Sequence, residues 1–191
     1  MSQVFLQCLQ AMNKFITEDD TGPEAPWVLI CGPSAIGKSY FMAAYDFYRA
    51  GPALYKAGYK LELFDIAGCG APGQRARISG HGLANIHHHV TLTSRPKTWP
   101  TSWYTKEYKI KQRAIILGVP YFVWQERVQK RRLKKPDKRA WSASINTFEG
   151  WYKKAVISLN KNDVPYILVD NRNDFPILDE SSFFTMITSN E

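Results

Sequence analysis

Residues 32–39 read Gly-Pro-Ser-Ala-Ile-Gly-Lys-Ser, a complete G-x-x-x-x-G-K-[ST] phosphate-binding loop. Gly32 and Gly37 allow turns that a side chain would obstruct, so successive backbone N–H groups can point toward a polyphosphate. Lys38 then reaches the β- and γ-phosphates, and the Ser39 hydroxyl can bind Mg²⁺ at the start of the next helix. The motif therefore predicts a site for ATP and Mg²⁺. The predicted nucleotide contacts are Gly32, Pro33, Ser34, Ala35, Ile36, Gly37, Lys38, Ser39 and Tyr40.

The segments on either side of this loop have the composition that the motif requires. Residues 27–31 form a short apolar run that predicts a buried strand, and residues 40–48 continue as a helix. Strand, glycine loop and helix are the context in which such a loop binds phosphate. The alternative is a structural turn that has the same letters by chance.

A carboxylate is also needed, either to accept a proton from an acceptor hydroxyl or to hold the metal and its water. Asp65 is the first candidate for both roles, because it ends the alternating run at residues 59–66. Ligands bind at the carboxyl ends of parallel strands in open α/β sheets. The alternative for Asp65 is a turn or cap residue, and Asp46 is a weaker candidate for the base.

The composition limits the class of protein. A chain of 191 residues with 45% hydrophobic and 14% aromatic residues is expected to fold as a single domain over residues 1–191. No run approaches the length of a membrane span, and the first residues lack the pattern of a signal peptide. The three widely spaced cysteines have no metal-ligand spacing. We therefore expect reduced thiols and a cytoplasmic location, and the oligomeric state stays open.

The net charge of +8 is concentrated in two segments. Residues 127–139 contain eight lysines and arginines against one aspartate, and residues 95–113 alternate basic residues with Trp99, Trp103 and Tyr104. Basic surfaces attract polyanions, and aromatic rings can stack on the bases of a single strand. These features favour a nucleotide or nucleic-acid partner. The alternatives are a solvated basic helix and aromatic residues in the core.

The order of predicted elements indicates an α/β protein. Helices are expected at residues 3–17, 40–48, 109–117 and 144–160, and strands at residues 27–31, 59–66, 86–93, 119–124 and 164–169. Alternating strands and helices imply right-handed crossovers. With the glycine-rich motif, this order resembles a P-loop NTPase fold, which implies three layers, α/β/α, with a roughly five-stranded parallel sheet and a lid segment.

This arrangement resembles the P-loop kinases of the nucleoside-monophosphate kinase group, and residues 32–34 also resemble the loop of guanylate kinases. Residues 121–132 are similar to the family's strand that runs into a lid, here about residues 125–140. The resemblance implies that Arg127, Arg131 and Arg132 close over the triphosphate, with Arg127 and Arg131 stabilising charge during transfer. It also implies that residues 170–172, Asn171 among them, lie where such kinases contact the base.

One departure concerns the third strand, which in these kinases usually ends in a metal-binding acid. Here residues 87–95 have none, so Asp65 takes that role or water and a threonine hold Mg²⁺. Neighbouring histidines on a strand point to opposite faces, so a metal site is less favoured than hydrogen bonding of an acceptor by His89.

The acceptor stays open at this stage. The arrangement is similar to small bacteriophage kinases, among them those that phosphorylate 5-hydroxymethyluracil in DNA, so a 5-hydroxymethylpyrimidine in DNA is the first expectation. The alternatives are a nucleoside or nucleoside-monophosphate kinase, a polynucleotide end kinase, and a nucleic-acid-binding NTPase that transfers no phosphate.

Overall fold

The computed structural model describes residues 2–17, 27–38, 40–41, 61–64, 85–91, 112–134, 143–161 and 163–189. In chain order the elements are α1 (Gln3–Thr17), β1 (Trp27–Gly32), β2 (Leu61–Phe64), β3 (Asn85–Thr91), β4 (Gln112–Gly118), α5 (Tyr121–Lys134), α6 (Ile145–Lys161), β5 (Tyr166–Asp170), β6 (Ile177–Leu178) and α7 (Glu180–Thr188).

The described strands form one sheet in the order β2-β3-β1-β4-β5-β6. Strands β2, β3, β1, β4 and β5 pair in parallel, and the short β6 pairs antiparallel with β5. Strand β1 lies between β3 and β4, so that Ile30 is level with His89 on one side and Ile115 on the other. The expected mixed α/β class with a mostly parallel sheet is confirmed. The antiparallel strand β6 was not expected.

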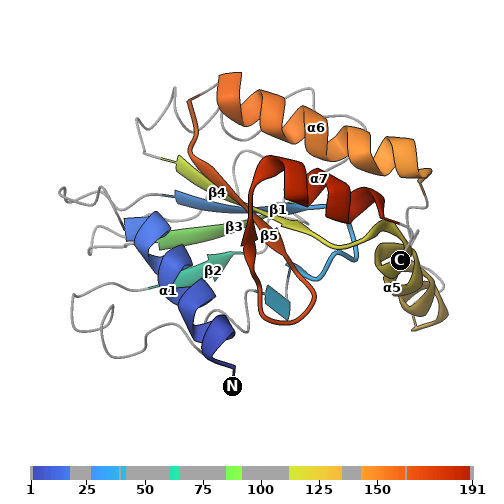
Figure 1. Cartoon of the computed structure of the whole chain (residues 1–191), viewed down its shortest axis with the longest axis horizontal. Helices are drawn as coiled ribbons and strands as arrows, with labels where there is room; N and C mark the ends of the chain where they lie inside the picture. Colours follow the sequence, from blue (N-terminus) through green and yellow to red (C-terminus); the bar gives the residue numbers. More distant parts are fainter. Residues whose placement is uncertain are drawn as a thin grey trace.

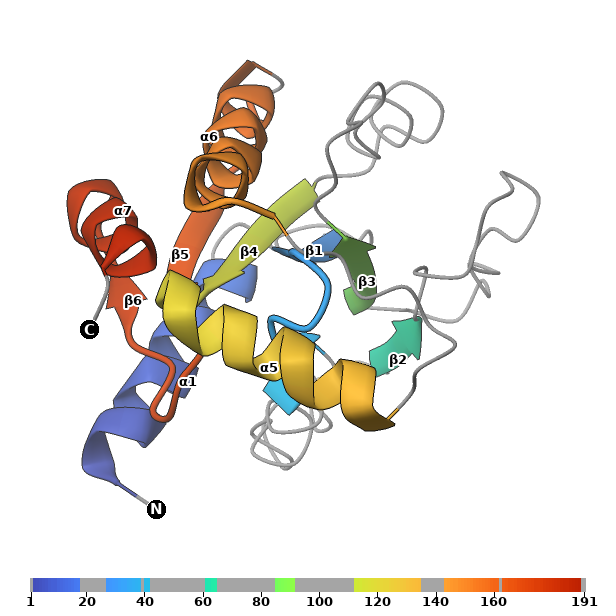
Figure 2. The same ribbon diagram turned by 90° about the vertical axis from the view of Figure 1, so that its right-hand side faces the viewer.

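Helices lie on both faces of this sheet. Helices α6 and α7 lie on one face and α1 on the other (Figures 1 and 2). Helix α1 turns Phe5, Leu9 and Met12 into the core at helical spacing, as its sequence pattern predicts. Helices at residues 3–17 and 144–160 and strands within residues 59–66, 86–93 and 164–169 were expected, and α1, α6, β2, β3 and β5 confirm them within the described residues.

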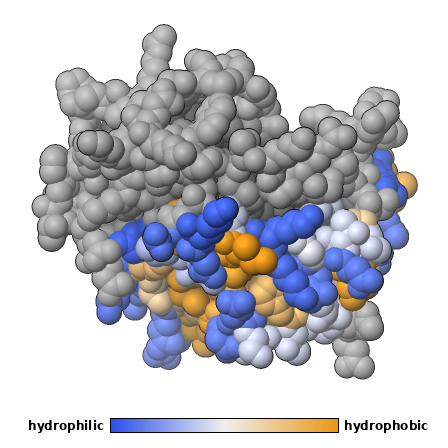
Figure 3. All heavy atoms as spheres, turned by 90° about the horizontal axis from the view of Figure 1, so that it is seen from above, coloured by the Kyte–Doolittle hydropathy of each residue, from blue (hydrophilic) through white to orange (hydrophobic). Residues whose placement is uncertain are grey.

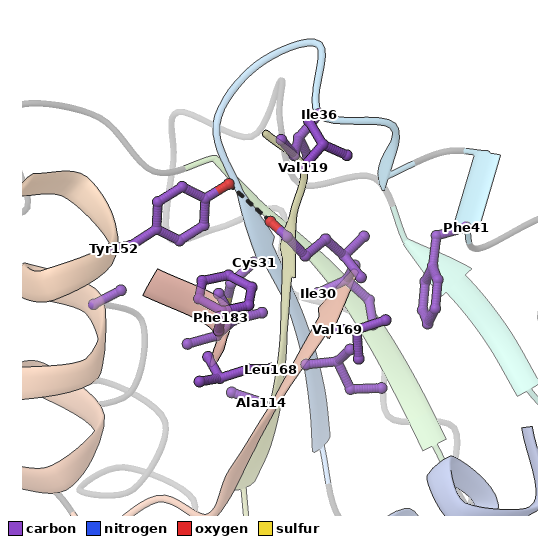
Figure 4. Close-up of a cluster of buried hydrophobic side chains, with 14 of the residues drawn as sticks. Ile30, Cys31, Ile36, Phe41, Ala114, Val119, Tyr152, Leu168, Val169 and Phe183 are labelled. Atoms are coloured by element: carbon purple, nitrogen blue, oxygen red, sulfur yellow. Dashed lines mark hydrogen bonds between the residues drawn. The ribbon is translucent and has the colours of Figure 1, made fainter. Parts of the chain in front are cut away.

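The core lies between the central strands and the helices. Figure 4 shows buried side chains of β1, β4 and β5, with Tyr152 of α6 and Phe183 among them. The Tyr152 hydroxyl donates a 2.9 Å hydrogen bond to the Leu117 carbonyl and ties α6 to β4. Burial raises the pKa of Tyr152 well above its ordinary value, so the phenol stays neutral. Residues 113–120 are buried, as a central strand requires.

Two predicted elements were wrong. Residues 109–117 were expected to be helical, but β4 occupies Gln112–Gly118, and residues 119–124 were expected to be a strand, but α5 begins at Tyr121. Both errors have the same cause, because one apolar run covers the end of a strand and the start of a helix. The Trp124 N–H donates to the Pro120 carbonyl at 3.1 Å, which is the first bond of the helix. The aromatic residues then pack on α6, with 4.7 Å between the Trp124 and Phe148 rings.

The surface is mixed in character. Seen from above Figure 1, the described residues include many hydrophilic ones with smaller hydrophobic areas between them (Figure 3). Among the described residues, no helix combines the length and the apolar character that crossing a membrane needs.

Candidate phosphate-binding site

The phosphate-binding loop connects the end of β1 to a helix whose first described residue is Lys38. Two of its residues have a positive φ, Ala35 at 66° and Gly37 at 105°. The Phe41 N–H donates to the Gly37 carbonyl at 2.9 Å, which is a helical hydrogen bond. The chain therefore turns sharply out of the sheet and enters the helix directly.

Both glycines of the motif lie against neighbouring atoms. A Cβ atom on Gly32 would lie 2.7 Å from Ile36 Cγ2 and 3.1 Å from the Leu117 carbonyl oxygen. A Cβ atom on Gly37 would lie 2.6 Å from Asn171 Nδ2, at a φ that side chains rarely allow. The loop is therefore packed so closely on its surroundings that a side chain at either glycine would collide with a neighbouring atom.

Lys38 lies inside the curve of the loop. Its Nζ donates to the carbonyl oxygens of Gly32 at 2.6 Å and Pro33 at 2.9 Å, and the residue is only 3% exposed. These two carbonyls are neutral acceptors. The arrangement places a positive charge at the concave side of the loop, where the motif predicts the phosphate groups of a nucleotide.

Helix α5 lies across the loop that follows β1 (Figure 2). The Trp124 Nε1 donates to the Ser34 carbonyl at 2.8 Å, and an Arg127 guanidinium nitrogen donates to the Ile36 carbonyl at 2.6 Å. One turn further along, a guanidinium nitrogen of Arg131 lies 3.0 Å from the Ser34 hydroxyl. Three side chains at helical spacing therefore contact the same loop.

Asn171, directly after β5, completes this set of contacts. Its Nδ2 donates to the Ile36 carbonyl at 2.9 Å, and its backbone carbonyl accepts from Arg127 at 3.2 Å. Its own N–H donates to the Gly118 carbonyl at 2.7 Å, which continues the pairing of β5 with β4. Its Oδ1 is buried and has no hydrogen-bond partner among the described residues. The ends of β4 and β5 and the start of α5 thus meet at the loop.

Burial and neighbouring groups shift the pKa of three side chains at this end of the sheet. Burial lowers the pKa of the Arg127 guanidinium, and the nearby Asp170 opposes this change. Asp170 is buried and forms an ion pair with Arg172, whose NH2 lies 2.6 Å from Oδ2. Hydrogen bonding to Asp170 raises the pKa of Arg172. At the end of β1, burial raises the pKa of the Cys31 thiol to about 12, although the charge of Lys38 opposes this.

The structure brings together many of the residues that the sequence selected. Arg127, Arg131 and Asn171 all contact the loop. Tyr40 is exposed, and its ring centroid lies 6.3 Å from that of Phe175. Arg132 is exposed on α5. The roles of all these residues in binding or catalysis stay predictions.

Other predicted residues lie outside the described residues. These are Ser39, Asp46, Asp65 and the aromatic residues at positions 99, 103 and 104. The predicted lid at residues 125–140 is described only as far as Lys134, and that part is the helix α5. The backbone of β3 carries the three histidines, and nothing is described of their side chains. Within the described part of the chain, no three His, Cys, Asp or Glu side chains could jointly hold a metal ion.

Sequence reasoning missed one residue of the site and underestimated the role of another. Trp124 was placed on a strand, whereas its indole N–H contacts the loop. The helical spacing of Trp124, Arg127 and Arg131 was the available signal. Asp170 was noted only as part of the segment after β5, and no pattern in the sequence indicates its ion pair with Arg172.

The sequence matches no protein-family model and no curated protein. The fold is similar to a chain of the PezAT chromosomal toxin–antitoxin system of the human pathogen Streptococcus pneumoniae, with a TM-score of 0.56 and 8% identity. This match covers 100% of the present chain and 89% of the other.

Two solved structures of AvrRxo1-ORF1 with AvrRxo1-ORF2 are similar to a lesser degree. The one with sulphate ions has a TM-score of 0.46 and 16% identity, and the one with ATP has a TM-score of 0.43 and 14% identity. Each match covers 96% of this chain and 70% of the other. At these identities, the PezAT match shows a shared fold alone.

Proposed function

We propose that this chain is an ATP-dependent phosphotransferase, built as one domain over residues 1–191, that moves the γ-phosphoryl group to a hydroxyl acceptor. The observation that carries the proposal is the position of Lys38 inside a loop of the G-x-x-x-x-G-K-[ST] type, bonded to the carbonyls of Gly32 and Pro33. Strand β1 before the loop and the helical residues Lys38, Tyr40 and Phe41 at its end also support the proposal.

The chemistry requires positive charge and positioning. Phosphoryl transfer spreads negative charge over the oxygens of the transferred group, so catalysis depends mainly on cations and on alignment. Loop N–H groups and Lys38 would bind the β- and γ-phosphates. Arg131, whose guanidinium lies at the Ser34 hydroxyl, would add a second positive charge.

A metal ion and a general base complete the proposed site. Ser39 and Asp65 would hold Mg²⁺, which when bound neutralises charge on the β- and γ-phosphates. Asp65 would also accept the proton of the acceptor hydroxyl. The buried ammonium of Lys38 and the close-packed glycine loop are compatible with an anionic ligand.

We propose a nucleotide or nucleic acid as the acceptor, with a 5-hydroxymethylpyrimidine in DNA as the first candidate. The second half of α5 supports a polyanionic acceptor, because Lys130, Arg131, Arg132 and Lys134 are exposed on this helix, which contacts the loop through Arg131. A surface of this kind attracts phosphate backbones at low salt.

The experiment incubates the protein with γ-labelled ATP, Mg²⁺ and four acceptors: a nucleoside, a nucleoside monophosphate, plain DNA and hydroxymethylated DNA. Label on hydroxymethylated DNA alone supports the first candidate, whereas label on a mononucleotide indicates a free-nucleotide kinase. Label on the 5′ end of plain DNA indicates a polynucleotide end kinase. Label appearing only as free phosphate contradicts the transferase and leaves an NTPase.

Variants make the assay specific to the loop. Lys38→Ala should abolish transfer while the fold is kept, because the variant lacks the ammonium group that would bind the phosphates. Lys154→Met, which removes one positive charge from an exposed position of α6, is the matched control and should keep the wild-type rate. Unchanged turnover in Lys38→Ala would contradict the assignment of the loop.

A further inference from the structure

Two loop carbonyls accept hydrogen bonds from side chains of α5 and of the residue after β5. The Ser34 carbonyl accepts from Trp124, and the Ile36 carbonyl accepts from both Arg127 and Asn171. We call these three hydrogen bonds the outer contacts of the loop. The loop is thus held by its carbonyls and not only by its own turns.

The planarity of the peptide bond gives the outer contacts a consequence for the opposite side of the loop. In a trans peptide, the C=O of one residue and the N–H of the next point in opposite directions. When the Ile36 carbonyl turns to Arg127 and Asn171, the Gly37 N–H turns away from them. In the same way, the bond from Trp124 to Ser34 turns the Ala35 N–H away from α5.

The backbone at both residues depends on these directions. Ala35 and Gly37 are the loop residues with a positive φ, and a non-glycine residue such as Ala35 adopts this region only at a cost. Ile36, which comes between them in the sequence, has a buried side chain that belongs to the hydrophobic core (Figure 4). The outer contacts and this buried anchor therefore act on the same stretch of chain.

We propose that Trp124, Arg127 and Asn171 are positioning residues that orient the N–H groups of Ala35 and Gly37 toward bound phosphate. This inference rests on the proposed nucleotide site. It gives Arg127 a different task from the lid role that the sequence implied, since both of its terminal nitrogens bond to backbone carbonyls. Asn171 likewise acts on the loop and not on the base.

Binding data can separate a residue that positions the loop from a residue that contacts the terminal phosphate. Loop N–H groups contact the phosphates that a diphosphate and a triphosphate share, whereas a lid arginine contacts the terminal group. Loss of a positioning residue should therefore weaken ADP and a non-hydrolysable ATP analogue by the same factor. Loss of a terminal-phosphate contact should weaken the analogue alone.

The experiment measures the dissociation constants of both nucleotides for the whole chain by calorimetry. Arg127→Met and Arg127→Lys should each weaken both nucleotides about tenfold. Lysine keeps the charge but lacks the planar fork whose two terminal nitrogens bond separately to the Ile36 and Asn171 carbonyls. Trp124→Phe should weaken both about threefold, since phenylalanine keeps an aromatic ring but lacks the indole N–H donor. Lys154→Met is the charge-matched control and should bind as wild type does.

Three results would overturn the proposal: a loss confined to the ATP analogue, full affinity in Arg127→Lys, or wild-type affinity in all variants. Thermal melting identifies a variant that fails to fold. If an Arg127 variant fails in this way, the affinities of Trp124→Phe still test the proposal. A second measurement does not depend on nucleotide binding. The Gly37 amide resonance of the ligand-free protein should shift in Arg127→Lys and stay in place in Lys154→Met. If wild type binds neither nucleotide, the proposed function fails, whereas an unmoved resonance contradicts the positioning role itself.

Discussion

Gly37→Ala is the substitution whose effect the structure defines most sharply. The added Cβ atom would lie 2.6 Å from Asn171 Nδ2 and 3.2 Å from a guanidinium nitrogen of Arg127. Both of these groups bond to the Ile36 carbonyl, so they cannot move aside without breaking the outer contacts. The backbone adds to the problem, because φ is 105° at this residue.

The two effects can be given magnitudes. Holding an alanine in so sparsely populated a backbone region costs about 1–3 kcal/mol. Breaking one of the two hydrogen bonds to Ile36 costs about 1 kcal/mol more. The sum is about 3 kcal/mol of unfolding free energy, and for a chain of this size that lowers Tm by about 10 °C. Nucleotide affinity should fall with it, since the Gly37 N–H loses its direction.

The assay is urea unfolding followed by circular dichroism, with Gly150→Ala as the matched control. Gly150 lies in α6, and a Cβ atom there would have no heavy atom within 4 Å. The same substitution should therefore stabilise the protein by about 0.5–1 kcal/mol through helix propensity. If Gly37→Ala is as stable as wild type, the loop does not pack on Arg127 and Asn171 as described, and the reasoning fails.

Three further results are expected. Gly118→Ala should lower the unfolding free energy by about 1–3 kcal/mol, because the new Cβ atom lies 2.5 Å from the Phe183 ring; an unchanged urea midpoint would contradict this packing. The pKa of Cys31 is raised from 9.0 to about 12, so the folded state holds this proton more tightly and stability is lost as pH rises from about 9 toward 12. The expected slope is about 1.4 kcal/mol per pH unit, and Cys31→Ala should reduce it; equal slopes in both proteins would exclude the thiol as the cause. Asp65→Asn should lower kcat at least about 10²-fold in the transfer assay if the carboxylate is the base, whereas a near-wild-type rate would point to Asp46 or a water.

Helices α1 and α6 could be predicted because their patterns are periodic and long, whereas α7 (Glu180–Thr188), near the C-terminal end, was not predicted. Phe5, Leu9 and Met12 recur at the spacing of one helical face, and all three are buried. In α6, Phe148, Trp151 and Tyr152 do the same. Such patterns survive in tertiary structure because one continuous face must be buried.

The segment around residues 112–124 could not be assigned from its pattern. A continuous apolar run has neither the period of a strand nor that of a helix. The aromatic residues at 121–124 favour a strand by local propensity, but their packing on α6 stabilises the helix instead. Tyr121 and Trp124 pack on Phe148 of α6, with ring centroids 5.6 and 4.7 Å apart.

By itself, the sequence determined the G-x-x-x-x-G-K-[ST] loop and its place between a strand and a helix, because the glycine spacing and the lysine are local features of the chain. Tertiary structure alone decided what surrounds the loop. Trp124, Arg127 and Asn171 come from distant positions, and they reach Ser34 and Ile36 only because α5 and the end of β5 meet at the carboxyl edge of one sheet. Helical spacing indicates that Trp124 and Arg127 share a face of one helix. Which carbonyl each side chain meets depends on the position of that helix and on strand order, and neither follows from spacing along the chain.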